Sequence, residues 1–169
     1  MRTATHNSTR PTSSLTRGRR QKARIELSAG GIVYQRSAAG PLVAFLLDPY
    51  GKWTFAKGHV RRAAGEEPPS AARRETEEEM GLTGLKVIEK LGTTEIWFRD
   101  RYHHKGALVH KYITYFLMEA PAGSVGYPEI KEKIKAIAWV PVSEAINFSQ
   151  YANLRPVLKQ AVRRIEEIL

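Results

Sequence analysis

Four glutamates crowd into five consecutive positions of the stretch RRETEEEMGL, residues 73–82, in a chain whose formal net charge is +10. On a helix, which turns by about 100° per residue, Glu75, Glu78 and Glu79 fall within roughly 100° of arc. Glu77 falls on the opposite side, where water can solvate it. Like charges three or four residues apart repel one another on a helix, so the face with three carboxylates needs a counter-charge.

Two interpretations of this face follow from the residues alone. It can be a solvated, charged surface on which Arg74 pairs with Glu78 four positions later. It can also hold a hard divalent cation such as Mg²⁺, which binds clustered carboxylate oxygens and takes waters and substrate phosphates as further ligands. One arginine is too little counter-charge for three carboxylates, which favours the metal and, with it, phosphoryl chemistry.

The surrounding sequence predicts where the helix begins and ends. Pro68 and Pro69 fit a first helical turn, and Gly81 fits the position just past a helix end. Apolar and β-branched runs predict strands at 25–36, 41–48, 85–99, 107–120 and 135–142, with a short extended piece at 53–60. Further helices are predicted at 143–148 and 153–169. The order of elements predicts an α/β fold with a mixed sheet between helices.

The 169 residues suffice for one domain, and their positive charge is concentrated at the start of the chain. Residues 1–24 hold seven Lys/Arg and no acid, which leaves 20 basic residues against all 17 acids in residues 25–169. We expect residues 1–24 to be a disordered basic tail and residues 25–169 to form the folded domain. The tail has three interpretations: a silent extension, a weak polyanion-binding arm, or an organelle transit peptide.

Composition excludes several classes of function. The chain has no cysteine, which excludes disulfides, thiolate metal sites and cysteine nucleophiles. No apolar run approaches the roughly 18 residues that a membrane span needs. We therefore expect a cytoplasmic protein that does not enter a membrane.

The stretch from Gly58 to Leu82 resembles the Nudix box, whose pattern is G, five residues, E, seven residues, R-E-apolar-x-E-E-x-G-apolar. From Glu66 onward every interval agrees with that pattern, including the seven residues that precede Arg74. Two departures stand out: seven residues rather than five follow Gly58, and Thr76 replaces the usual aliphatic residue. The resemblance implies a Nudix-type α/β/α sandwich, with a mixed sheet between helices, over residues 25–169.

The resemblance also implies roles for the residues of the box. Glu75, Glu78 and Glu79 would bind Mg²⁺ or Mn²⁺, often with the carbonyl of Gly58, and Arg74 would orient one of these glutamates.

Further roles concern turns, loops and the general base. Gly65 would serve a turn, while Glu66 would either order its loop or bind metal. The general base would be a box glutamate or a carboxylate from a later loop, for which Glu129 and Glu132 are the candidates.

Two segments outside the box, WTFAKGHV (53–60) and HKYITYFLME (110–119), resemble segments of diadenosine tetraphosphate hydrolases, although alanine replaces the proline usual before KG. By this resemblance Lys57, His59 and Lys111 would contact phosphate; solvated lysines and a loop-anchoring histidine are the structural alternatives. Tyr127 or Tyr102 would stack on a purine or simply pack at the rim.

The resemblance thus implies metal-dependent hydrolysis of a nucleoside diphosphate linked to a group X. We rank dinucleoside polyphosphates first, ahead of 8-oxo-dGTP-like triphosphates and inositol pyrophosphates, with nucleotide sugars and RNA caps also open. A non-enzymatic nucleotide- or RNA-binding module is the alternative of another class. The tail lacks the aromatic residues that stack on bases, so nucleic acid would bind it only weakly. Nudix enzymes are often dimers, so a homodimer also stays open.

Overall fold

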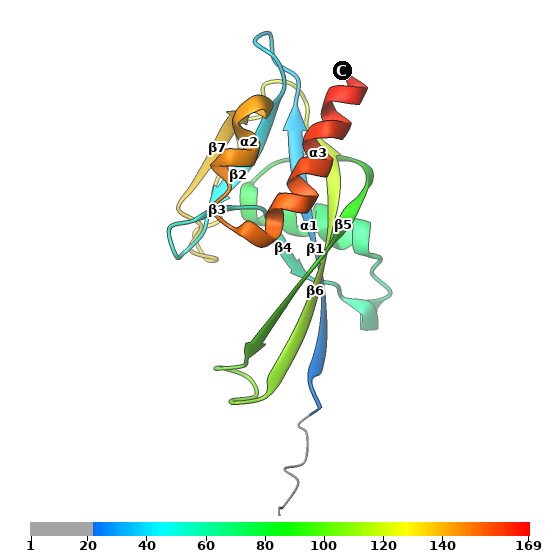
Figure 1. Cartoon of the computed structure of the whole chain (residues 1–169), viewed down its shortest axis with the longest axis vertical. Coiled ribbons are helices and arrows are strands. Elements are labelled where there is room, and N and C mark those ends of the chain that lie inside the picture. Colours follow the sequence, from blue (N-terminus) through cyan, green and yellow to red (C-terminus); the bar gives the residue numbers. More distant parts are fainter. Residues whose placement is uncertain (1–21) are drawn as a thin grey trace, which may run out of the picture.

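Residues 22–169 are described by the computed structural model (Figure 1). The predicted basic tail of residues 1–24 lies outside the described residues, apart from Lys22, Ala23 and Arg24. Arg24 is already the first residue of the first strand.

Within the described residues, seven strands form one mixed sheet. They are β1 (Arg24–Gln35), β2 (Leu42–Leu47), β3 (Trp53–Thr54), β4 (Lys57–His59), β5 (Lys86–Arg99), β6 (Leu108–Glu119) and β7 (Ala136–Pro141). The main path of the sheet runs β3-β2-β1-β6-β5, and in addition β4 pairs with β1 and β7 pairs with β2. β1 and β6 run parallel, whereas the other pairs are antiparallel. The predicted mixed sheet is confirmed.

In residues 22–169, three α-helices cover the two faces of this sheet: α1 (Pro68–Met80), α2 (Val142–Phe148) and α3 (Arg155–Ile168). Side chains alternate between the faces of a strand, so β1 contributes to two separate cores. Ile32 and Tyr34 pack beneath α2 and α3, while Ala29 and Val33 pack against α1. Helices therefore lie on both sides of the sheet (Figure 1), which confirms the predicted α/β/α sandwich.

The ends of α1 follow from its sequence. Pro68 and Pro69 occupy its first turn, where a missing N–H is no loss, and Gly81 ends it with a φ of 59°. A Cβ on Gly81 would lie 2.6 Å from the carbonyl oxygen of Tyr127. Glycine is thus required both for the left-handed turn and for the close approach of the loop that contains Tyr127.

A second pair of glycines brings the segment before α1 down onto the sheet. A Cβ on Gly30 would lie 2.5 Å from the carbonyl oxygen of Ala56. The amide of Gly31 donates a hydrogen bond to that same oxygen across 3.2 Å. This close approach sets the position of Lys57 and Gly58, the first two residues of β4.

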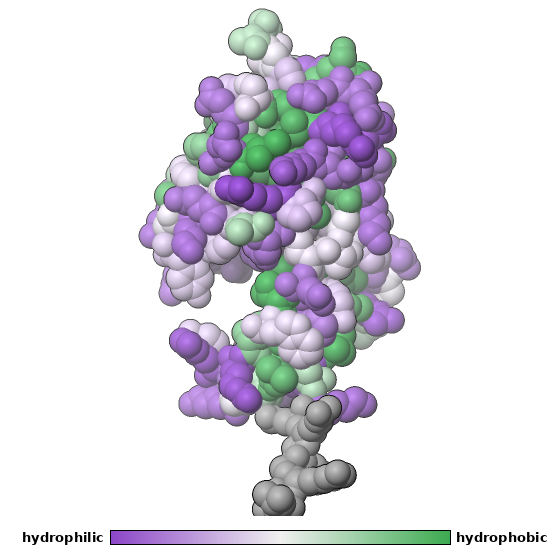
Figure 2. All heavy atoms as spheres, viewed as in Figure 1, coloured by the Kyte–Doolittle hydropathy of each residue, from purple (hydrophilic) through white to green (hydrophobic). Residues whose placement is uncertain are grey.

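β5, β6 and the start of β1 extend beyond the helices as a three-stranded arm (Figure 1). On this arm Trp97 stacks on His110 with ring centroids 3.7 Å apart, and His110 lies 4.2 Å from the ring of Tyr112. Trp97 and His110 face each other across β5 and β6, and such a cross-strand pair stabilises a sheet where no helix covers it. The molecule narrows into this arm, which ends in the hairpin tip of residues 100–107 (Figure 2).

Two short 3₁₀ helices differ from the predicted elements. η1 (Arg62–Ala64) forms inside the segment predicted as a loop, which also contains the two extra residues between Gly58 and Glu66. η2 (Ala152–Leu154) occupies the start of the predicted helix 153–169, so α3 begins only at Arg155.

Candidate active site

Gly58 and Glu75 are in direct contact at the centre of the site. A Cβ on residue 58 would overlap the Cδ and both carboxylate oxygens of Glu75. Only a residue without a side chain fits there, so β4 and α1 approach each other closely at this point. The carboxylate of Glu75 and the backbone of Gly58 thereby come together in spite of the insertion that follows Gly58.

Arg74 connects the loop before α1 to the glutamates on the helix. Its Nε and Nη2 donate to the two carboxylate oxygens of Glu66, across 2.7 and 3.0 Å, and Nη2 also donates to the carbonyl oxygen of His59. Its Nη1 pairs with Glu75 and lies 3.3 Å from Oε2 of Glu78. The hydrogen bond to Glu66 is the main reason that the pKa of Arg74 is raised. One guanidinium therefore holds three carboxylates in place.

Glu66 closes the loop that contains η1. Besides its two bonds from Arg74, its Oε2 accepts a hydrogen bond from the backbone amide of Arg61 across 2.8 Å. The bonds from Arg74 and Arg61 favour the charged form and lower the pKa of Glu66 to about 2.

Glu79 lies deeper than the other box glutamates. Its Oε2 accepts a hydrogen bond from the amide of Lys57 across 3.2 Å. Burial raises the pKa of Glu79 to about 7, and the charges of Glu75 and Glu132 add to this increase while Lys57 opposes it. Consecutive residues of β4 thus touch two carboxylates: Lys57 bonds Glu79, and Gly58 adjoins Glu75.

Two lysines approach these carboxylates from the sheet. The pKa of Lys111 is lowered, first because its ammonium is buried and second because the charge of Lys57 is close. The carboxylates of Glu26, Glu75 and Glu79 oppose that decrease. The two ammonium groups and the carboxylates therefore form one mixed-charge cluster, which suits an anionic substrate that brings its own cations.

Glu78 and Glu77 face water to different degrees. The side chain of Glu78 is 53% exposed and that of Glu77 is 39% exposed. Nε of Arg73 lies 4.0 Å from Glu77, whereas Glu78 shares Arg74 with the rest of the site. Thr76, which precedes Glu77, is fully buried, and its hydroxyl donates to the carbonyl oxygen of Ala72 across 2.7 Å.

The fit of this cluster to a metal ion rests on its donor atoms. Among residues 22–169, no three His, Asp or Glu side chains converge closely enough to form a preformed cage. The side chains of Glu75, Glu78 and Glu79 and the backbone of Gly58 supply oxygen donors only, which is the donor type that Mg²⁺ prefers. A Cβ at residue 58 would fill the space against Glu75, so the glycine keeps that space open. These residues fit a hard divalent cation.

Two residues named from the sequence lie away from this cluster. His59 is 64% exposed, and its Nε2 lies 3.1 Å from a carboxylate oxygen of Glu26. Tyr127 is 70% exposed, and its amide donates to the carbonyl oxygen of Met80 at the end of α1. The structure does not bring either side chain to the box glutamates Glu75, Glu78 and Glu79.

The loop after Tyr127 passes beside Glu79. The amide of Glu129 donates to the carbonyl oxygen of Glu79 across 3.1 Å, but its own carboxylate accepts a hydrogen bond from the amide of Lys131. The charge of Glu132, by contrast, acts on Glu79.

A cavity of about 530 Å³ opens beside Lys57; we call it the inner cavity. Its lining includes Lys57, Glu95, Ile96, Ile113, Tyr115 and Asn153. The apolar residues among these come from β5 and β6. A largely apolar cavity with a few polar groups is the usual form of a small-molecule site.

Asp48 and Tyr151 form one wall of the inner cavity. The hydroxyl of Tyr151 donates to Oδ2 of Asp48 across 2.5 Å, and Oδ1 of Asp48 accepts from the amides of Tyr50 and Lys52. Burial and the bond to Asp48 raise the pKa of Tyr151 to about 12. This wall was not predicted, since the sequence indicates only the turn formed by DPYGK and its partner lies 103 residues away.

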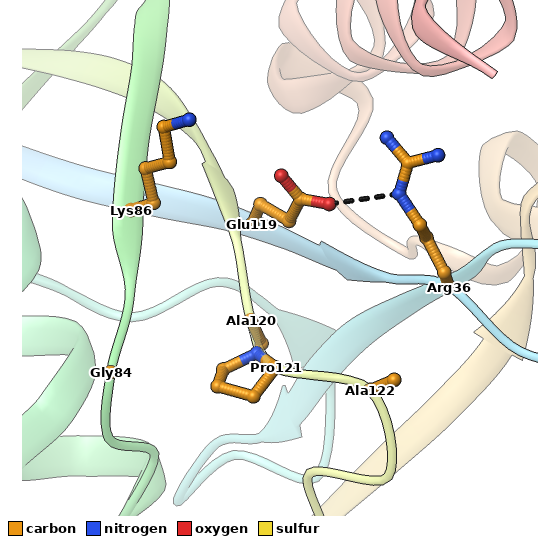
Figure 3. Close-up of a pocket in the computed structure, with 7 residues that line it drawn as sticks. All are labelled: Arg36, Gly84, Lys86, Glu119, Ala120, Pro121 and Ala122. Carbon is orange, nitrogen blue, oxygen red and sulfur yellow. Dashed lines mark hydrogen bonds and ion pairs between the residues drawn. The ribbon is translucent and has the colours of Figure 1, made fainter.

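Another hollow, of about 250 Å³, lies where β1 and β6 end (Figure 3). Arg36 and Glu119 point toward each other across it, with Nε of Arg36 3.0 Å from the carboxylate. These two charges neutralise one another, and no box residue lines the hollow. It is separate from the candidate active site.

The comparisons with known proteins agree with this geometry. The family model described as the NUDIX domain matches residues 25–165, and the chain belongs to the Nudix family. A search of curated proteins finds no match. Membership of this family and the fold support a pyrophosphohydrolase, an enzyme that hydrolyses phosphoanhydride bonds. Nudix hydrolases generally use divalent metals such as Mg²⁺.

Several solved structures share the fold at low identity. A Caenorhabditis elegans Ap4A hydrolase in a binary complex is 23% identical, with a TM-score of 0.65 over 84% of this chain and 98% of that one. The Escherichia coli dihydroneopterin triphosphate pyrophosphohydrolase is 20% identical, with a TM-score of 0.62 over 82% and 95%. The NUDIX domain of Shewanella oneidensis NrtR, solved with ADP ribose, is 14% identical, with a TM-score of 0.57 over 85% and 90%. At these identities the likeness shows the fold alone.

In the part of the chain that the structure describes, no helix is long and apolar enough to cross a membrane.

Proposed function

We propose that this protein is a metal-dependent pyrophosphohydrolase that cleaves a dinucleoside polyphosphate such as diadenosine tetraphosphate. The observation that carries the proposal is that one residue, Lys57, joins the inner cavity to the box glutamates. Lys57 lines the inner cavity and, through its amide, bonds Glu79 of the box. A nucleoside held in the inner cavity would therefore place its phosphates beside the box glutamates.

Mg²⁺ or Mn²⁺ would be held by Glu75, Glu78 and Glu79 together with the carbonyl of Gly58. When bound, such a cation neutralises phosphate charge and lowers the pKa of a bound water. Arg74 keeps Glu75 and Glu78 in position through its Nη1. Holding the carboxylates in place before the substrate arrives avoids a cost of rearrangement during the reaction.

Lys57 and Lys111 would bind the phosphate chain. Burial, and after it the charge of Lys57, lowers the pKa of Lys111. An anion between the two ammonium groups would relieve their mutual repulsion. Among the carboxylates of the later loop, we assign the task of assisting the attacking water to Glu132 rather than Glu129. The carboxylate of Glu129 is occupied by the amide of Lys131, whereas the charge of Glu132 acts on Glu79.

A nucleoside fits the inner cavity better than a sugar phosphate does. Ile96, Ile113 and Tyr115 present an apolar surface on which a purine can lie, and Asn153 can bond its polar edge. The resemblance of WTFAKGHV to diadenosine tetraphosphate hydrolases supports the same choice.

A substrate panel tests the proposal. Purified protein with Mg²⁺ is given diadenosine tetraphosphate, ATP, 8-oxo-dGTP, ADP-ribose and an inositol pyrophosphate, and products are separated by chromatography. We expect one water to convert diadenosine tetraphosphate into ATP and AMP much faster than the other compounds react. Faster turnover of any other member, or activity that survives chelation of the metal, would contradict the proposal.

The metal assignment has its own test. Glu78→Gln should lower turnover by about 100-fold or more, since even residues that merely orient metal ligands are worth 10- to 100-fold. Because the side chain of Glu78 is half exposed, the melting temperature should change little. Glu77→Gln, one position away on the other side of α1, is the matched control and should keep full activity.

A further inference from the structure

A second hollow lies beside the inner cavity, between the β2–β3 turn and the tip of the β5–β6 hairpin. This outer cavity has a volume of about 650 Å³ and is lined by Tyr50, Phe98, Arg99, Asp100, Arg101 and Tyr102. Tyr50 also lines the inner cavity, so the two cavities adjoin at this residue. Figure 2 shows the surface hollowed on one side, between the body of the molecule and the hairpin tip.

Exposed aromatic rings surround the outer cavity from two separate elements. Tyr50 is 85% exposed and Tyr102 is 83% exposed, while Phe98 between them is 39% exposed. Large rings that gather around a hollow and stay in contact with water mark a binding site rather than a core. β5 advances by roughly 3.3 Å per residue, so Glu95 of the inner cavity and Arg99 of the outer cavity lie about 13 Å apart.

The hairpin tip is held in one conformation by Asp100. Its Oδ1 accepts hydrogen bonds from the amides of Tyr102 and His103, across 2.8 and 3.1 Å, and Oδ2 accepts one from the amide of His104 across 2.9 Å. Its carbonyl oxygen accepts from Gly106 across 2.8 Å. The tip therefore presents its side chains before any ligand binds, which lowers the entropic cost of binding.

The side chains of Arg101 and Tyr102 are not used within the fold. In residues 22–169 neither makes a hydrogen bond or an ion pair through its side chain. A free cation beside a free aromatic ring is the combination that binds a nucleotide, since the ring stacks on the base and the guanidinium meets the phosphate.

We propose that the outer cavity is the subsite for the distal nucleoside of the dinucleoside polyphosphate, with its base stacked on Tyr102 and Tyr50 and its adjacent phosphate paired with Arg101. This inference rests on the proposed function, because it takes the inner cavity and the box glutamates as the place of cleavage. The substrate then lies along β5, with one nucleoside in each cavity and the phosphate chain between them.

The test compares two substrates that differ only in the distal nucleoside. Diadenosine tetraphosphate and adenosine 5′-tetraphosphate carry the same phosphate chain, and the KM of each is measured for wild type, Tyr102→Ala, Tyr102→Phe and Arg101→Ala. Tyr102→Ala should raise the KM for diadenosine tetraphosphate about tenfold through lost stacking. It should leave the KM for adenosine 5′-tetraphosphate and the kcat for both substrates unchanged.

The other variants discriminate further. Tyr102→Phe keeps the ring and should behave as wild type, while Arg101→Ala should raise the KM for the dinucleotide by an amount that shrinks as salt increases. His103→Ala changes the same loop at a residue outside the outer cavity and is the matched control. Equal effects of Tyr102→Ala on both substrates, or no effect on either, would overturn the subsite.

A binding measurement separates this inference from the proposed function. Calorimetry with Ca²⁺ in place of Mg²⁺ gives the affinity of both compounds whether or not they are hydrolysed. If wild type hydrolyses neither compound but Tyr102→Ala still weakens binding of the dinucleotide alone, the proposed reaction is wrong and the subsite stands. If the two compounds bind wild type equally tightly, the distal nucleoside makes no contact and the subsite is refuted.

Discussion

The backbone of Gly58 lies against the carboxylate of Glu75, with no room for even one methyl group between β4 and α1. Gly58→Ala must therefore displace Glu75 or push β4 away from the helix. A shift of about 1 Å at a catalytic group can cost roughly 100-fold in rate, so we expect at least that loss of turnover. Steady-state kinetics on the folded variant, verified by circular dichroism, would measure it.

Gly65→Ala is the matched control for that substitution. Gly65 has a φ of 74°, and no other group lies within 4 Å of the place that a Cβ would occupy, so alanine there would be strained but would touch nothing. The left-handed conformation costs an L-residue roughly 1–2 kcal/mol, and we expect a loss of stability with activity retained. Equal kinetic effects of the two alanines would show that Gly58 has no special relation to Glu75.

Arg74→Lys tests whether the planar guanidinium is needed. Arg74 donates to both oxygens of Glu66 and at the same time to the carbonyl of His59, which a single ammonium cannot reproduce. We expect chemical denaturation to show a loss of about 1–3 kcal/mol, together with reduced turnover. Arg73→Lys, whose Nε lies 4.0 Å from Glu77 in an exposed pair, should change stability by less than about 0.5 kcal/mol. A stable, fully active Arg74→Lys would mean that charge alone suffices.

Acid should remove the stabilisation that the Glu66 carboxylate gives to the folded state. Its pKa falls from 4.5 to about 2 on folding, so the folded state favours the carboxylate. The stabilisation is therefore present above pH 4.5 and is lost as the pH falls through about 2. The difference in urea midpoint between wild type and Glu66→Gln should be constant near neutral pH and should narrow below the unfolded pKa of 4.5. A difference that does not depend on pH would place the effect in packing rather than charge.

Local signals explain why parts of the fold were predictable. The bounds of α1 follow from prolines that fit only a first turn and from Gly81, whose positive φ few other residues adopt. The strands could be predicted because β1 and β6 are rich in apolar and β-branched residues, whose side chains enter two cores, and because a run of apolar residues marks β2. The start of α3 was placed too early because a 3₁₀ turn keeps Leu154 buried on the same side as the helix that follows.

The binding cavities were not predictable from the sequence in this way. Asp48 reads as an ordinary turn residue, and nothing near it indicates that Tyr151 closes over it. β7 pairs antiparallel with β2 and ends beside Leu42, at the end of β2 that is remote from the β2–β3 turn. The chain then passes through α2 before Tyr151 meets Asp48, so their contact depends on tertiary packing. Tyr127 was a reasonable choice as a stacking residue by type, but the fold carries it to the end of α1. The residues of the box can be predicted from their spacing in the sequence, whereas the residues that line a cavity are brought together by tertiary contacts.

The bond between Tyr151 and Asp48 gives the last prediction, because it links stability to substrate binding. Tyr151→Phe keeps the ring but removes the hydroxyl that donates to Oδ2 of Asp48, a residue only 7% exposed. Loss of one hydrogen-bond partner by a buried carboxylate lowers the free energy of unfolding by about 1–3 kcal/mol, which thermal or chemical denaturation would detect.

Oδ1 of Asp48 would still accept from the amides of Tyr50 and Lys52, so the turn should persist with more freedom. Because that turn carries Tyr50 at the junction of the two cavities, the KM should rise several-fold while kcat, set at the glutamates, stays the same. Asn153→Ala alters the same cavity without touching Asp48 and should raise KM with no comparable loss of stability. A fall in kcat in Tyr151→Phe would show instead that this wall communicates with the catalytic glutamates.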